Sequence, residues 1–103
     1  MTATTAIELP ALTARQAIAL ASDPRTARSV LVVLSHDRAP TVRAGVARNR
    51  MCPPSVAIGL AGDPNHRVLG ELAANPAVPG HLRQLAATRA GNPDWPPKAG
   101  NPV

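Results

Sequence analysis

Arginine is the residue type in this sequence with the clearest capacity for binding chemistry. Ten of the eleven basic residues are Arg, and with six acidic residues they give a formal net charge of +5. A guanidinium group binds carboxylates and phosphates through paired N–H donors. The excess of positive charge therefore favours an acidic partner, either a phosphate backbone or an acidic protein face. The candidate binding residues are Arg28, Arg38, Arg43, Arg48, Arg50 and Arg67.

The remaining reactive residue types form no catalytic or metal-binding pattern. His36, His66 and His81 share no metal-ligand spacing with one another or with Cys52, which is the only cysteine and has no partner for a disulfide. The sequence has no glycine-rich phosphate loop, no nucleophile elbow and no suitably spaced carboxylate pair. We therefore expect a protein that is not an enzyme and binds no cofactor or metal.

A chain of 103 residues has room for one domain with one modest core. The longest apolar run, Val30 to Leu34, is much shorter than a membrane span, and the first residues lack the pattern of a signal peptide, so we expect none. We expect a cytoplasmic protein that does not enter a membrane.

A four-residue motif recurs along the chain and indicates an internal repeat. The motif is an apolar residue, a small residue, any residue and a polar residue that can cap a helix. Its closing polar residues are separated by 14, 12, 14, 12 and 13 positions, which indicates a unit of about 26 residues made of two unequal halves. Two alternating segments predict a helical hairpin. The six closing residues are Asp23, Asp37, Asn49, Asp63, Asn75 and Thr88.

Each half of the unit has the apolar spacing of a short helix, because a second apolar residue precedes the motif by three or four positions. Pro40, Pro54 and Pro79 suit a first helical turn, where the missing N–H is not needed. The closing polar residue is expected to end one helix and cap the next. The segment Val30 to Leu34 is β-branched enough to favour a strand, but it lies in register with the repeat and is predicted to be helical.

Helices of eight to ten residues are marginal in isolation, so these must be stabilised by packing on one another. The sequence therefore predicts an all-α domain in which about six short helices stack as about three hairpins. The predicted apolar seam consists of Ile18, Leu20, Val30, Leu31, Leu34, Val42, Val46, Val56, Leu60, Val68, Leu69, Leu72, Leu82 and Leu85.

The two ends of the chain differ from the repeats. We assign residues 1–9 to an N-terminal extension, 10–90 to the helical domain and 91–103 to a tail rich in proline and glycine. Ile7, Leu9 and Leu12 could extend the first helix, which would then run to Ala21. Trp95, the only aromatic residue, either covers the apolar end of the last helix or anchors a partner.

The segments Leu34 to Arg43 and Asp63 to Pro76 resemble the variant leucine-rich repeat, and more distantly HEAT repeats. The resemblance implies a right-handed α-solenoid built from short α and 3₁₀ helices. One member of that family carries a cysteine-rich iron–sulfur cluster, which the single Cys52 does not reproduce. HEAT-like stacks also use an Asp followed six residues later by an Arg as an internal ladder, and Asp37 with Arg43 has this spacing.

Two roles therefore remain open for the arginines. Arg28, Arg43 and Arg67 lie near the starts of alternate predicted helices and are expected on one side of the stack, either as a binding stripe or as bonds to neighbouring Asp side chains. The first functional hypothesis is a module that binds an acidic protein. The alternatives are a binder of duplex nucleic acid without sequence preference, and a homo-oligomeric structural protein whose oligomeric state the sequence does not define.

Overall fold

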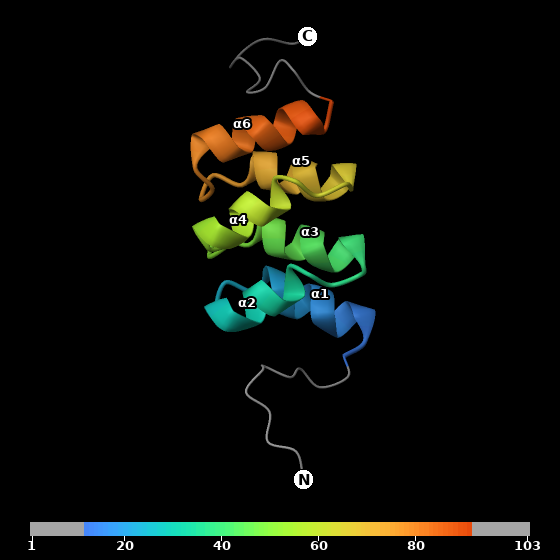
Figure 1. Ribbon diagram of the computed structural model, residues 1–103. Coiled ribbons are helices and arrows are strands. Elements are labelled where there is room, and N and C mark those ends of the chain that lie inside the picture. The colour runs from blue at the N-terminus through green and yellow to red at the C-terminus, as the bar shows by residue number, and fades with distance from the viewer. Residues whose placement is uncertain (1–11, 92–103) are drawn as a thin grey trace, which may run out of the picture.

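A computed structural model describes residues 12–91 of the chain. This part is all-α, with six helices and no strand (Figure 1). None of these helices is long and apolar enough to cross a membrane. The helices are α1 (Ala14–Ser22), α2 (Arg28–Leu34), α3 (Pro40–Arg48), α4 (Pro54–Leu60), α5 (His66–Ala74) and α6 (Gly80–Arg89).

Four of the helices lie on one another in a column (Figure 1). The most extensive contacts join α1 to α3, α3 to α5, and α5 to α6. The shorter α2 and α4 lie at the side of this column, and each has fewer contacts with the helices before and after it. The column is the more extensively packed part of the domain, and α2 and α4 form a second layer that is less extensively packed.

The helix boundaries follow local sequence signals. The first residues of α1, α3 and α5 are 26 positions apart, and so are those of α2, α4 and α6. Pro40 and Pro54 occupy the first turns of α3 and α4, as predicted, whereas Pro79 is the residue before α6. The apolar segment from Val30 to Leu34 is helical, as predicted, despite its β-branched composition.

The first helix is shorter than the sequence suggested. It begins at Ala14 because Thr13 and Gln16 form a capping box: the Thr13 hydroxyl accepts the Gln16 N–H, and the Gln16 side chain accepts the Thr13 N–H. Leu12 therefore precedes the helix, and the possible extension through Ile7 and Leu9 lies outside the described residues. All six helices are α-helices, so the 3₁₀ segments implied by the family resemblance are not found between residues 12 and 91.

The buried core is aliphatic and rich in alanine. Of the predicted seam, ten residues are buried, and Ile18, Leu20 and Val30 are partly buried against the same core. Leu85 is the exception, since it is 41% exposed while the adjacent Ala86 is fully buried. The expected motif is therefore displaced in the last helix, where Thr88 lies inside α6 instead of ending it.

Small residues set the spacing between α1 and α3. Ala17, Ala21 and Ala44 are buried there, and a Cβ atom on Gly45 would lie 3.0 Å from the Cβ of Ala21. That separation is below normal van der Waals contact, so these two helices pack as closely as they do because position 45 has no side chain.

Candidate binding surface and the groove between α2 and α4

Arg43 is a structural residue that joins two loops. Its Nε and Nη2 donate to the two carboxylate oxygens of Asp63 at 2.7 and 3.2 Å, and its Nη1 donates to the carbonyl oxygens of Asp37 and Arg38. The side chains of Arg43 and Asp63 are only 15% and 6% exposed. The hydrogen bonds that Arg43 donates to Asp63 raise the pKa of Arg43 above its ordinary value. The pair is bidentate and largely buried, which makes it part of the architecture.

The observed pair differs from the predicted ladder in an instructive way. Arg43 does bind Asp37, but through the backbone carbonyl, and the carboxylate that it binds belongs to Asp63, 20 residues later. Two other aspartates, Asp23 and Asp63, are followed by an arginine at a spacing shorter than six residues, and neither binds that arginine. Asp23 bonds Arg25 instead of Arg28, and Asp63 bonds Arg43 instead of Arg67. One rung therefore exists among the described residues, and it connects the loop before α3 with the loop before α5.

A second set of bonds, made by asparagine, connects the column along its other edge. The Asn49 amide donates to the carbonyls of Ala21 and Asp23 at 2.7 and 2.9 Å. The Asn75 amide donates in the same way to the carbonyls of Ala47 and Asn49, at 2.8 Å each. We call these four bonds the asparagine ladder. The bonds to Ala21 and Ala47 supply a donor to carbonyls in the last turn of the preceding column helix. The carbonyls of Asp23 and Asn49 also accept the N–H groups of Thr26 and Cys52.

Both ladder asparagines are almost fully buried, with 1% and 4% exposure for Asn49 and Asn75. Their amide oxygens are used as well, since they accept the N–H groups of Met51 and Ala77. The first residue of the series is Asp23, which accepts the Arg25 N–H but has no amide to donate. Asn49 and Asn75 therefore do more than end one helix and cap the next, which is the role that the sequence predicted for them.

The closing aspartates likewise bond residues two positions ahead. Asp37 accepts the Ala39 N–H at 2.8 Å, and Asp63 accepts the Asn65 N–H at 2.9 Å. These are turns in the connecting loops, and not side-chain caps on the first turns of the following helices. Asn65 provides the true cap of α5, because it accepts the N–H groups of Arg67 and Val68.

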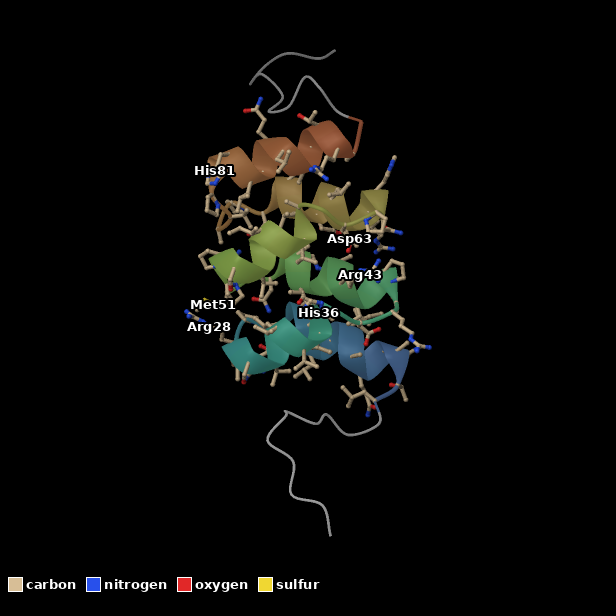
Figure 2. All side chains as sticks on the ribbon, viewed as in Figure 1. Arg28, His36, Arg43, Met51, Asp63 and His81 are labelled. Atoms are coloured by element: carbon tan, nitrogen blue, oxygen red, sulfur yellow. The ribbon has the colours of Figure 1, made fainter. Side chains whose placement is uncertain are left out.

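The proposed arginine stripe does not form on one side of the domain. Arg28 and Arg43 lie at opposite edges in Figure 2. Arg28 is the first residue of α2, which belongs to the open layer, whereas Arg43 and Arg67 belong to the column helices α3 and α5. The prediction assumed that all three begin equivalent helices, and α2 is not equivalent to α3 and α5.

Most of the remaining arginines are exposed and have no acidic partner. Arg48 lies 3.6 Å from Glu71 and Arg25 pairs with Asp23, both at the surface. The Arg25 hydrogen bond lowers the pKa of Asp23. Among residues 12–91, six exposed arginines have no hydrogen bond or ion pair from their side chains. These unpaired arginines are Arg15, Arg28, Arg38, Arg50, Arg67 and Arg89.

A groove of about 630 Å³ lies between α2 and α4. Val56 and Leu60 of α4 are the buried apolar residues of its lining, and Val32 contributes an exposed apolar side chain from α2. The lining also includes Gly59 and Gly62, where no side chain fills the space. Its polar lining residues are Ser35, His36, Asp37, Arg38, Arg43, Ser55 and Asp63.

The groove exists because the two short helices are held apart by the column. Contacts between α2 and α4 are few or absent, while each packs on the adjacent column helices. The sequence alone did not predict the groove, because the groove depends on how the layers are spaced. One residue pointed to open space: position 59 is glycine, whereas the position 26 residues earlier, in α2, is Val33.

Cys52 and the histidines do not form a reactive cluster. Cys52 is buried, and burial raises the pKa of its thiol to about 11. No group of three or more His, Cys, Asp or Glu residues within 12–91 could hold a metal ion. Trp95 lies outside the described residues.

Comparison with known proteins gave no match to a family model, to a curated protein or to a solved structure.

Proposed function

We propose that this chain is a non-enzymatic binding module that recognises an acidic protein. In this proposal the six helices form a short right-handed α-solenoid of three hairpins, of the kind found in the variant leucine-rich repeat family and more distantly in HEAT repeats. Such stacks offer an extended surface to a partner while the packed column maintains the shape. The recurring motif and the 26-residue spacing of the helix starts support this arrangement.

The observation that carries the proposal is the imbalance of charge at the surface. Within residues 12–91, Asp23, Asp63 and Glu71 are each in an ion pair, and Asp37 accepts a backbone N–H. Six exposed arginines have no such partner. An uncompensated cationic surface attracts an acidic partner and accelerates its association.

Duplex nucleic acid is a second candidate, since the same unpaired arginines could contact phosphates. The distribution of these arginines from α1 to α6 suits a partner held by charge alone. The groove between α2 and α4 favours a protein, because its buried apolar residues Val56 and Leu60 suit aliphatic side chains, which a phosphate backbone does not have.

The two candidates are separated by titrating the whole chain with two fluorescent probes. One probe is a peptide rich in glutamate and leucine, and the other is a duplex DNA of about 20 base pairs, the length chosen to offer many phosphates. We expect the peptide to bind and to retain measurable affinity when salt is raised from about 50 to about 200 mM. Tight binding of the duplex that falls by about a hundredfold over this range would favour nucleic acid. No binding of either probe at low salt would refute both candidates.

A further inference from the structure

We infer that the groove between α2 and α4 is the recognition site for an extended segment of the acidic partner, with a short apolar centre and an acidic residue on each side. This inference rests on the proposed function and specifies the part of the surface that performs it. It depends on three properties of the groove: its apolar lining, its missing side chains and the unpaired cations near it.

The apolar lining indicates what the centre of the segment must be. Val56 and Leu60 are 7% and 3% exposed, so the bottom of the groove is part of the core, and Val32 adds an exposed apolar side at 39%. Aliphatic side chains entering this space would be removed from water, at about 25 cal/mol per Å² of apolar area. The groove therefore suits small or aliphatic residues at the centre of the segment.

The glycine in α4 provides the space for a backbone. Gly59 lines the groove in a helix interior, where glycine is less favourable than alanine. A Cβ atom built there has no neighbour within 4 Å, so the position is glycine without any packing need in the free protein. A partner's main chain approaching α4 would use that space.

The charges near the groove determine which residues flank the centre. Both acidic residues of the lining are already engaged, because Asp63 binds Arg43 and Asp37 accepts the Ala39 N–H. Arg38 is exposed and has no partner among the described residues. Arg28 is outside the lining, but it is exposed and unpaired and lies one helical turn before Val32 in α2, whereas Arg38 follows the other end of that helix. A carboxylate on either side of the apolar centre would therefore meet a guanidinium.

The length of the groove limits the segment. Helix α4 has seven residues and is thus about 10 Å long. An extended chain advances about 3.3 Å per residue, so about three residues span the helix. We expect a recognition core of about five residues: three apolar or small, with one acidic residue at each end.

The inference can be tested by selecting binders from a random heptapeptide library displayed on phage, using the whole chain as bait. The blocking variant is Gly59→Leu, which places a side chain in the groove and increases helix propensity. Its matched control is Gly70→Leu in α5, another exposed helical glycine with no neighbour within 4 Å, outside the groove lining. Circular dichroism and thermal unfolding would verify that both variants fold.

We expect selected peptides to have acidic residues on both sides of an aliphatic centre. They should bind the wild type and Gly70→Leu alike, and Gly59→Leu at least about tenfold more weakly, a loss typical of a blocked central contact. Arg38→Glu should weaken binding more than Arg89→Glu, whose site is the last residue of α6. Equal binding to Gly59→Leu and Gly70→Leu would overturn the groove as the site.

The results also separate this inference from the proposed function. Acidic peptides that bind all glycine variants equally, and that lose affinity equally with Arg38→Glu and Arg89→Glu, would leave an acidic-partner module without a groove site. Selection that yields no acidic peptides would overturn both. Binding of duplex DNA that is weakened by either arginine change but not by Gly59→Leu would assign the surface to nucleic acid and overturn the groove as well.

Discussion

Replacing Asn49 with Asp tests the asparagine ladder with almost no change in shape. The substitution removes the amide that donates to the carbonyls of Ala21 and Asp23. A carboxylate replaces that amide at a position that is 1% exposed. Two hydrogen bonds are lost, two carbonyls lose a donor, and a charge is buried beside two dipoles that repel it. The Asn49 oxygen that accepts the Met51 N–H is retained.

The size of the effect follows from these losses. The Ala21 carbonyl would lose its donor, at a cost of about 1–3 kcal/mol, while the Asp23 carbonyl would still accept the Thr26 N–H. An unpaired buried charge costs about 3–5 kcal/mol when it cannot relax. Allowing for relaxation, we expect the free energy of unfolding to fall by about 4 kcal/mol at neutral pH. A domain of this size is stable by about 4–12 kcal/mol in total, so much of its stability would be lost. The midpoint of thermal unfolding should fall by about 15–30 °C.

Urea unfolding followed by circular dichroism would measure this loss, with Asn65→Asp as the control. Asn65 caps α5 only through its oxygen, which aspartate supplies equally well, so the control should change stability by less than about 1 kcal/mol. Burial should raise the pKa of the introduced carboxyl at position 49 above its unfolded value of about 3.9. The loss relative to wild type should therefore be smallest near pH 4 and grow as the pH rises. Equal stability of the two variants at neutral pH would refute the ladder's contribution.

Three further predictions follow from the packing and the buried groups. Arg43→Met should lower the free energy of unfolding by about 3 kcal/mol, since Asp63 would stay buried without its partner, and addition of Asp63→Asn should recover part of the loss in chemical denaturation. Gly45→Ala should destabilise by about 1–2 kcal/mol because of the close approach to α1, whereas Gly70→Ala should stabilise by about 0.5–1 kcal/mol; thermal unfolding that ranks them the other way would contradict the packing. Cys52, with its thiol pKa of about 11, should react with Ellman's reagent at about pH 8 roughly 200-fold more slowly in the folded chain than in denaturant, and comparable rates would show an accessible thiol.

The sequence was sufficient to predict the helices because each is specified by local signals. Apolar residues at helical spacing, the prolines at 40 and 54 and the closing polar residues together define where most helices begin and end. The start of α1 was missed although the capping box of Thr13 and Gln16 was readable. The end of α6 was missed because its motif is displaced by one residue, which exposes Leu85 and buries Ala86.

The candidate site was harder to predict because it depends on distances between elements. The partner of Arg43 is 20 residues away, and no spacing within one helix indicates it. The groove depends on α2 and α4 lying apart, which is a property of layer spacing. The asparagine ladder is visible in the sequence as a choice of residue type. The motif ends in asparagine at 49 and 75, where the side chain donates to carbonyls of a preceding helix, and in aspartate at 23, 37 and 63.

The use of aspartate after α1 and of asparagine after α3 and α5 distinguishes the two ends of the column. An asparagine at the end of a column helix donates to carbonyls of the column helix before it, so its amide is satisfied only when that helix is present. The aspartate that ends α1 has no amide to satisfy. At the other end, α6 lies on α5 with Ala86 and Ala87 buried, and no closing asparagine follows it in the described residues. The direction of the column is thus marked by three side chains of nearly identical size: Asn49 and Asn75 donate to the preceding column helix, whereas Asp23 has no amide to donate.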